Sequence, residues 1–350
     1  MKKVLIVRLS SMGDIIFHIP LANILKKNGY EVGWVVSEKG YELLKNNPCT
    51  DKVYLVPAKK WKKCWFNILN FFEYLKILSE IRKEKYDIVL DCQQMFKSLI
   101  WTIFSGAKRR IITKYAREFS QLGANEIIKD IKFNFNKHVV YHNLKYAKYL
   151  GLNTDEIKFT LPEASQKVKN YIDGLLADVD RSKPLVVIAP ATTREMKHWD
   201  ENNWRVLVDN LKESCSLIFT GVEEDRPLLE SIGADKGLNL CGKTNLEALC
   251  ELFSRVDLVM APDSGSAHLA RASNKPAVIA IFTCTPPAWY GPFGDKKYVS
   301  INGGLKCQPC AEPANCQNEG ENYKLCTKNP PPEKILNIVK KLLNFNTANT

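Results

Sequence analysis

The sequence predicts an α/β protein made of two doubly wound domains, each with a parallel sheet between layers of helices. Short segments rich in Val and Ile alternate with longer amphipathic segments, which is typical of βα units. The same alternation begins again after a polar stretch near the middle of the chain. A length of 350 residues also exceeds the size at which a single hydrophobic core usually stops growing, so two domains are expected.

The first half of the chain contains the first series of strands and helices. Buried strands are predicted at the short apolar runs 4–7, 32–36, 53–56 and 88–90. Helices are predicted at 15–27, 40–46, about 66–85 and 138–151, the last of which ends at a glycine. We assign these elements to a first domain, residues 1–165.

The second series follows a polar stretch, 162–183, in which we place the domain boundary. Its predicted strands are 185–188, 217–220, 238–239, 258–260 and 278–282, each followed by a helix-like run. These elements form a second domain, residues 166–329. Three prolines then precede an amphipathic helix at 333–345, which belongs to a C-terminal helix and tail, residues 330–350.

The composition predicts a soluble protein with anionic partners. Hydrophobic residues make up 45% of the chain, and no apolar run approaches the length that spans a bilayer. The apolar run at the N-terminus is short and leads into polar residues, so we expect no signal peptide and a cytoplasmic location. The net charge of +12 favours nucleic acid, phosphorylated small molecules or an acidic membrane surface, without choosing among them.

The loop after the first predicted strand has the sequence Ser10-Ser11-Met12-Gly13-Asp14. An acid in the first turn of a helix is usually a cap, because its carboxylate accepts hydrogen bonds from free backbone N–H groups. Asp14 also follows the carboxyl end of a strand, however, where ligands of open α/β folds bind. Local sequence favours the cap, and the position in the fold favours chemistry.

The loop after the first strand of the second domain, 189–199, carries two hydroxyls and two cations. Thr192, Thr193, Arg194 and Lys197 precede a predicted helix, and such a combination suits a phosphate group. A capped loop with solvated cations explains the same residues equally well.

A second loop of this domain, 261–268, places Asp263 and small residues before a helix. Backbone N–H groups at the start of that helix could face an anionic ligand. A capping role for Asp263 and a core position for His268 are the structural alternatives.

A third loop, 221–226, contains Glu223 and Glu224 after a strand. An acid there can hold the vicinal hydroxyls of a ribose, although acidic first turns are common for helix-dipole reasons alone. The sequence has no Walker loop, no H-E-x-x-H motif and no GxGxxG after the first strand, so nucleoside triphosphatases, zinc proteases and ordinary dinucleotide enzymes lose their usual support.

Four of the eleven cysteines lie near the C-terminus with the spacing C-x2-C-x5-C-x9-C. Thiols in such a pattern can bind a structural zinc ion or an iron–sulfur cluster. Reduced thiols in a surface loop are the alternative, as expected for a cytoplasmic protein. The four residues are Cys307, Cys310, Cys316 and Cys326.

A basic and aromatic run extends from Lys59 to Phe66 and includes Lys62 and Lys63, and a second basic group lies at 108–110. Trp and Lys together suit the interface of an anionic membrane. Nucleic acid would favour similar residues, and a solvated loop is the simplest explanation.

Several motifs in a fixed order resemble glycosyltransferase family 9, which includes the ADP-heptose:lipopolysaccharide heptosyltransferases. In the first domain they are RLSSMGDIIFHIP, YDIVLDCQQMFKSLIWTIFSGAKRRI and HVVYHNLKYAKYLG. In the second domain they are PATTREMKHW, LCGKTNLEALCELFSRVDLVMAPDSGSAHLA and the cysteine-rich tail. The SSMGD, ATTREMKHW and REFS stretches are most similar to heptosyltransferases of type I.

The resemblance implies a GT-B fold, in which two Rossmann-like domains face a central cleft. It implies an inverting, metal-independent transfer of heptose from ADP-L-glycero-D-manno-heptose to the Kdo-lipid A inner core of lipopolysaccharide, with no cofactor required. Asp14 would be the general base, and Lys197 would stabilise the departing ADP. The other residues implied to bind the nucleotide sugar are Thr192, Thr193, Glu223, Glu224, Asp263, Ser264, Gly265 and His268.

The implied acceptor is an anionic glycolipid at the cytoplasmic face of the inner membrane, so we expect peripheral contact with that membrane and no nucleic acid partner. The residues assigned to the acceptor are Ser10, Ser11, Gly13, Lys62, Lys63, Arg109, Arg110 and Arg117. Two alternatives stay open: a family 9 transferase with another nucleotide sugar or glycan acceptor, and a catalytically inactive binding protein of the same fold. The sequence departs from the usual family pattern at Met196 and at 283–287, which bears on the donor sugar more than on the reaction class.

Overall fold

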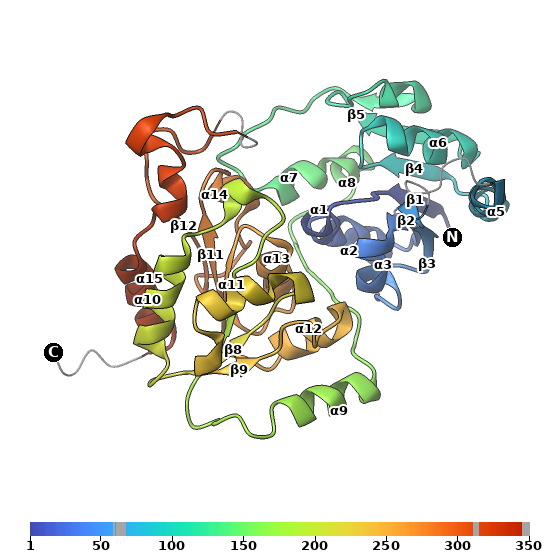
Figure 1. Cartoon of the computed structure of the whole chain (residues 1–350). Helices are drawn as coiled ribbons and strands as arrows, with labels where there is room; N and C mark the ends of the chain where they lie inside the picture. The colour runs from blue at the N-terminus through green and yellow to red at the C-terminus, as the bar shows by residue number, and fades with distance from the viewer. Residues whose placement is uncertain (59, 61–67, 311–314, 345–350) are drawn as a thin grey trace. The chain divides into compact units, whose positions relative to one another are not determined.

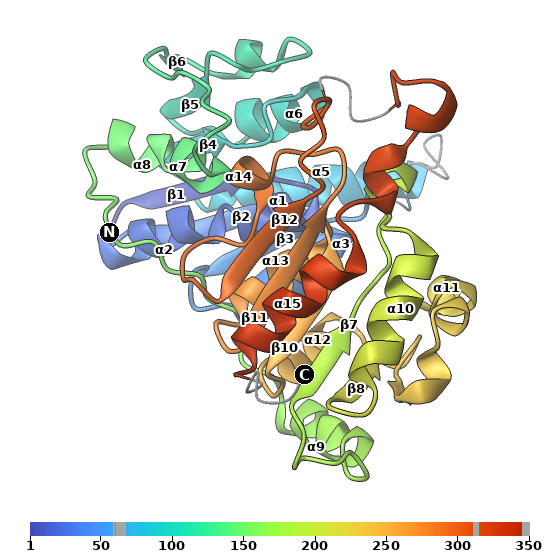
Figure 2. The same cartoon turned by 90° about the vertical axis from the view of Figure 1, so that its left-hand side faces the viewer.

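The computed structural model describes residues 1–58, 60, 68–310 and 315–344, which form two compact units (Figures 1 and 2). Unit 1 contains residues 1–134 and 139–163. Unit 2 contains residues 135–138 and the chain from Ala164 onward.

Unit 1 contains a six-stranded parallel sheet in the order β3-β2-β1-β4-β5-β6, the doubly wound order of a Rossmann fold. Its strands are β1 (Lys3–Val7), β2 (Glu31–Ser37), β3 (Lys52–Val56), β4 (Ile88–Asp91), β5 (Arg109–Thr113) and β6 (Glu126–Ile128). Its helices are α1 (Met12–Ile16), α2 (Ile19–Lys27), α3 (Glu38–Leu44), α5 (Ile68–Lys83), α6 (Phe96–Phe104), the 3-10 helix η1 (Ser120–Gly123), α7 (Val139–Asn143) and α8 (Lys145–Tyr149).

One face of this sheet is covered by α5 and α6. Leu78 and Ile81 of α5 and Trp101 of α6 share a buried cluster with Leu5 and Val7 of the first strand. Burial of these side chains from water stabilises the unit and fixes the strand ends that carry the polar loops.

Unit 2 repeats the arrangement, with the strand order β12-β11-β10-β7-β8-β9. Its strands are β7 (Leu185–Ile188), β8 (Ser216–Phe219), β9 (Leu238–Asn239), β10 (Leu258–Pro262), β11 (Ala277–Phe282) and β12 (Tyr298–Asn302). Its α-helices are α9 (Gln166–Leu175), α10 (Glu201–Leu211), α11 (Arg226–Ser231), α12 (Leu246–Phe253), α13 (Gly265–Ala272), α14 (Pro287–Tyr290) and α15 (Pro332–Leu342). Its 3-10 helices are η2 (Glu195–Lys197), η3 (Glu223–Asp225), η4 (Ala234–Lys236), η5 (Gly320–Asn322) and η6 (Leu325–Lys328).

The C-terminal helix α15 is part of the core of unit 2. Ile335 and Val339 are fully buried in the same cluster as Trp204 and Leu207 of α10 and Ile279 of β11. Figure 2 shows α15 in front of the sheet, beside β10 and β11.

The two sheets confirm the predicted class, an α/β protein with two Rossmann-like doubly wound domains. Three strands were missing from the prediction, namely β5, β6 and β12. The helix expected at 15–27 is interrupted after Ile16, and the one expected at 138–151 is two short helices, with His138 outside both. Pro20 explains the first interruption, since it lies at the start of α2, where its lack of an N–H group costs no hydrogen bond.

Among the described helices, none is both long enough and apolar enough to cross a lipid bilayer.

Candidate active site

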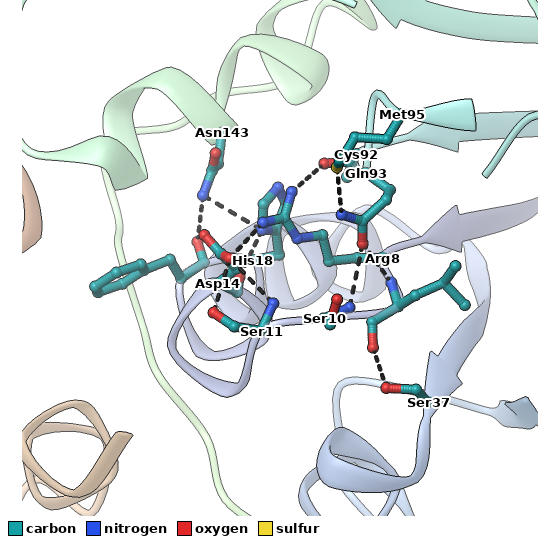
Figure 3. A network of polar contacts seen from close by, with 12 residues as sticks. Arg8, Ser10, Ser11, Asp14, His18, Ser37, Cys92, Gln93, Met95 and Asn143 are labelled. Atoms are coloured by element: carbon teal, nitrogen blue, oxygen red, sulfur yellow. Dashed lines mark hydrogen bonds and ion pairs between the residues drawn. The ribbon is translucent and has the colours of Figure 1, made fainter. Parts of the chain in front are cut away.

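The loop after β1 gathers polar side chains around Asp14 (Figure 3). Ser11 precedes α1, and both its backbone N–H and its hydroxyl donate to Oδ2 of Asp14, at 3.0 and 2.9 Å. Asp14 therefore does help to close the first turn of α1, as the capping interpretation expects. A second set of contacts goes beyond capping.

Arg8, the residue after β1, forms an ion pair with Asp14. Its Nη2 lies 2.6 Å from Oδ2, and its Nη1 donates to the carbonyl oxygen of Cys92 at 2.6 Å. Burial alone would raise the pKa of Asp14, but the Arg8 charge and the hydrogen bonds from Ser11 outweigh it, so the pKa lies below its usual value. The carboxylate is ionised at neutral pH, and within the described chain its Oδ1 carries no hydrogen bond, which leaves that oxygen able to accept a proton.

His18 and Asn143 hold the loop from its other side. Nδ1 of His18 lies 2.7 Å from the carbonyl oxygen of Asp14, and Asn143 of α7 donates to the carbonyl oxygen of Phe17 at 3.1 Å. Burial, reinforced by the nearby Arg8, lowers the pKa of His18 to about 3. The ring is therefore neutral at physiological pH and donates from Nδ1 to Asp14 (Figure 3).

The loop after β4 supports the loop after β1. The side-chain oxygen Oε1 of Gln93 accepts from the backbone N–H groups of Leu9 and Ser10, at 3.0 and 3.1 Å. Lys97, in the first turn of α6, donates from Nζ to the hydroxyl of Ser10 at 2.8 Å. Burial raises the pKa of Asp91, which accepts from this loop, to about 6.

The sequence interpretation had not assigned roles to Arg8, Gln93 and Lys97. Each lies within one of the motifs quoted above; Arg8 and Gln93 follow predicted strands closely, and Lys97 lies at the start of the next helix. Their position beyond a strand end was the available signal, because the carboxyl ends of parallel strands meet at one edge of the sheet.

The residues assigned to the acceptor fall into two groups. We call residues 8–18 the Asp14 loop; Ser10 and Ser11 lie in it before α1, and Gly13 precedes Asp14 within α1. The backbone N–H of Arg117 donates to the carbonyl oxygen of Gln94 at 3.0 Å, so it lies at the same edge of the sheet.

Arg109 and Arg110 lie at the opposite edge, at the amino end of β5. Arg109 makes a two-pronged ion pair with Glu126, with distances of 2.7 and 2.8 Å. Arg110 donates to the carbonyl oxygen of Gly123 at 2.7 Å. These two arginines thus have partners within unit 1 at this edge, and their role in acceptor binding stays a prediction, whereas Lys62 and Lys63 lie outside the described residues.

Unit 2 carries a second polar cluster, centred on Asp263 after β10. Lys197 lies 2.6 Å from Oδ2 of Asp263, which also accepts from the hydroxyl of Thr285 at 2.6 Å. His268 of α13 lies 3.5 Å from Oδ1. Burial alone would raise the pKa of Asp263, but His268 and Lys197 hold it well below its usual value, so this buried carboxylate stays ionised.

The N-terminus of α13 lies directly beside this cluster. Ser264 is the residue before the helix, and Gly265 is its first residue. The Ser264 hydroxyl is buried and has no hydrogen-bond partner within the described chain. A buried unsatisfied hydroxyl next to free helix N–H groups and the Lys197 cation suits an anionic ligand.

The predicted phosphate loop is built onto the strand end of β11. The hydroxyl of Thr283 donates to the carbonyl oxygen of Met196 at 2.5 Å, and Nε2 of His198 lies 2.9 Å from the carbonyl oxygen of Thr192. Thr192 is half-buried and Thr193 is exposed. Thr283 and Thr285, which the sequence interpretation had noted only as a departure from the family pattern, thus position Met196 and Asp263.

The two glutamates predicted to bind ribose lie on η3 and are exposed. The carboxylate of Glu223 is engaged by Arg226, at 2.6 and 2.7 Å. Glu224 is its exposed neighbour.

C-terminal cysteines pack against the predicted phosphate loop, 189–199, through Met196. Cys326 packs with Met196 and with Cys284, a residue outside the predicted set, and Cys310 and Cys316 pack against them. Cys307 is exposed. Burial and the neighbouring thiols raise the pKa of Cys326 to about 11. Within the described residues no three Cys, His, Asp or Glu side chains are arranged to hold a metal ion.

Two Rossmann-like units, each with polar loops at the carboxyl ends of its strands, define a two-domain α/β protein with candidate ligand sites at those strand ends. The model of glycosyltransferase family 9 (heptosyltransferase) matches residues 74–320, and the chain belongs to this family. It is therefore a glycosyltransferase.

Relatives and solved structures agree with this assignment. The chain is 29% identical to lipopolysaccharide heptosyltransferase 1 of Campylobacter coli, over 97% of this chain and 98% of that one. It is 24% identical to lipopolysaccharide heptosyltransferase 1 of Escherichia coli K12, over 85% of this chain and 92% of that one. The structure of E. coli heptosyltransferase WaaC with ADP covers 97% of this chain and 99% of that one, with a TM-score of 0.75 at 20% identity. That likeness confirms the GT-B fold.

Proposed function

We propose that this protein transfers a heptose from ADP-L-glycero-D-manno-heptose to the Kdo-lipid A inner core of lipopolysaccharide, with inversion and without a metal ion. The names of the relatives support the donor and acceptor classes. The observation that carries the proposal is the ionised Asp14, with one carboxylate oxygen fixed by Arg8 and Ser11 and the other unengaged.

In the proposed reaction, an acceptor hydroxyl held by unit 1 attacks the anomeric carbon of the donor. The bond between that carbon and the phosphate oxygen breaks, ADP leaves on the opposite face, and the hydroxyl proton passes to Oδ1 of Asp14. A base in such a position contributes about 10²–10⁴-fold in rate.

The second unit supplies the groups that suit the leaving ADP. Lys197 carries a positive charge next to the N-terminus of α13, and both favour the negative charge that develops on the phosphate as the bond breaks. Asp263 holds the Lys197 ammonium in place without taking part in proton transfer. Thr192 and Thr193 would bind the diphosphate, and Glu223 or Glu224 the ribose.

The proposed acceptor places the protein at the cytoplasmic face of the inner membrane as a peripheral protein. The basic net charge supports contact with anionic lipid.

The Asp14→Asn variant tests the proposal. We expect transfer from ADP-heptose to Kdo-lipid A, followed by chromatography of released ADP, to fall about 10²–10⁴-fold. ADP affinity, measured by calorimetry, should stay within about twofold of wild type, because Asp14 lies in unit 1. Full activity in the variant would rule out Asp14 as the general base. If wild type is active only with a different nucleotide sugar, that sugar would replace ADP-heptose as the proposed donor.

A further inference from the structure

The outer surface of one helical layer of unit 1 is unusually apolar. Eight of the nineteen exposed large hydrophobic residues in the described chain lie on α5, on α6 and on η1 with its preceding residue. Single exposed apolar residues need no explanation, but a concentration on adjacent segments marks an interaction surface.

On α5 these residues are Phe71, Phe72 and Leu75, which are 57%, 59% and 41% exposed. Leu78 and Ile81 of the same helix are buried against the sheet, so α5 carries apolar side chains both in the core and on the surface. A helix with this pattern is expected to contact something on its outer side as well.

Helix α6 also carries both exposed and buried large apolar side chains: Phe96, Ile103 and Phe104 are exposed, and Trp101 is buried. The rings of Tyr74 and Trp101 lie 5.0 Å apart, which ties α5 to α6.

The 3-10 helix η1 packs directly on α6, since a Cβ at Gly123 would lie 2.9 Å from the side chain of Leu99. Phe119 and Leu122 are each 71% exposed. The three segments thus form one layer over one face of the sheet, and we call the outward side of this layer the apolar face.

The charge of these segments indicates what the apolar face contacts. The segments α5, α6 and 119–123 contain four Lys or Arg and two Asp or Glu, a net charge of +2. Lys76 follows Leu75, and Lys97 follows Phe96, and all four side chains are exposed. Aromatic residues beside lysines suit a bilayer surface, where rings sit at the headgroup level and ammonium groups reach anionic lipids. An interface between two protein copies is instead depleted of lysine.

The apolar face also reaches the candidate acceptor site. Phe96 and Lys97 form the first turn of α6, and Lys97 contacts Ser10 in the Asp14 loop at 2.8 Å. Glu118 accepts from the backbone N–H of Phe96 at 3.1 Å, which joins the segment before η1 to the same point.

We infer that the apolar face formed by α5, α6 and η1 inserts into the surface of an anionic lipid bilayer and so presents the Asp14 loop to a lipid-linked acceptor. The second half of this inference rests on the proposed function, whereas bilayer binding itself does not.

Vesicle binding tests the inference. We would combine Phe71→Ser, Phe72→Ser, Phe104→Ser and Leu122→Ser, all exposed and outside the catalytic loops. A matched control would carry Val206→Ser and Val222→Ser, which are exposed apolar residues of unit 2. Vesicles of phosphatidylcholine with about one quarter phosphatidylglycerol would be sedimented with each protein.

We expect the four-residue variant to bind these vesicles at least about tenfold more weakly than wild type, and the control to bind as wild type does. Wild type should bind pure phosphatidylcholine more weakly than the anionic vesicles. Circular dichroism would verify the fold; if the combined variant is unfolded, Phe72→Ser alone should still weaken binding.

Equal vesicle binding by the variant and wild type would overturn the inference. A second result would also overturn it: wild type is a dimer that does not bind vesicles, and the four substitutions make it a monomer. A second copy would then cover the apolar face. Failure of the proposed function would be recognised separately. The four-residue variant should keep wild-type ADP affinity and should use a delipidated acceptor as well as wild type does. If wild type shows no transfer activity, the proposed function fails, but the sedimentation result still tests bilayer binding.

Discussion

Arg8 decides how the carboxylate of Asp14 is presented. Its guanidinium lies between Asp14 and the carbonyl oxygen of Cys92, so one end of the loop after β1 is joined to the end of β4 (Figure 3). A carboxylate paired in this way keeps its charge at lower pH than a free one. It also has a fixed orientation, because Arg presents its donors in a planar array.

The Arg8→Gln variant should move the acid limb of activity. Asp14 works as a base only when ionised, and its native pKa is held below the usual value, so activity is present above that pKa and is lost as pH falls through it. Without the guanidinium the pKa of Asp14 rises, and the loss begins at higher pH. The measurement is kcat/KM against pH.

Arg109→Gln is the matched control for this experiment. It removes an arginine of the same unit that pairs with Glu126 at the opposite edge of the sheet. The acid limb should stay where it is in wild type. An unchanged profile in Arg8→Gln, with wild-type folding, would show that Arg8 does not set the ionisation of Asp14.

Thr285 has a comparable role in unit 2, because its hydroxyl donates to the buried Asp263. Replacing it by the isosteric Val should lower the free energy of unfolding by about 1.5–3 kcal/mol, the usual range for a hydrogen bond to a charged group. The KM for the nucleotide sugar should rise, since Asp263 also orients Lys197. Urea unfolding and initial rates measure the two effects, and a neutral result in both would remove Thr285 from the donor site.

Among the secondary-structure elements, sequence patterning recovered the central strands and two edge strands, β3 and β9, and missed β5, β6 and β12. The strands β1, β4, β7, β10 and β11 are central, and burial on both faces makes them short runs of Val, Ile and Ala. In contrast, β6 has three residues, and β5 begins with two arginines that resembled a basic patch. Edge strands keep polar residues, so hydrophobic patterning alone does not separate them from loops.

The candidate site divides in the same way. Asp14, Lys197 and Asp263 could be predicted because each lies within about ten residues after the end of a strand, in a stretch whose local sequence carries the signal. Gln93 could not, since its bonds to Leu9 and Ser10 join residues more than eighty positions apart and arise only when β1 and β4 pair.

The helix α15 should contribute measurably to the stability of unit 2. Ile335 is fully buried in the cluster that includes Trp204 of α10. Ile335→Ala removes most of a buried side chain, which typically costs about 2–5 kcal/mol, and Lys340→Ala on the exposed side of the helix should cost almost nothing. Urea denaturation would compare them; equal stability of the two variants would show that α15 is not part of the core.

At the scale of the whole molecule, the proposed chemistry is divided between the units. The base and its supporting residues belong to unit 1, and the cluster around Asp263 belongs to unit 2. Each cluster is built on its own sheet and hydrophobic core, so each can be complete without the other's ligand.

Hydrogen exchange should therefore separate the two ligands along the chain. ADP should slow the exchange of amides at 192–198 and at the start of α13, because phosphate oxygens accept from backbone N–H groups there. The loop at 8–18 should exchange as in the free protein. Kdo-lipid A should protect 8–18 and the first turn of α6, where Lys97 contacts Ser10. Lys197→Gln should abolish only the ADP effect; protection of the Asp14 loop by ADP alone would contradict a donor site confined to unit 2.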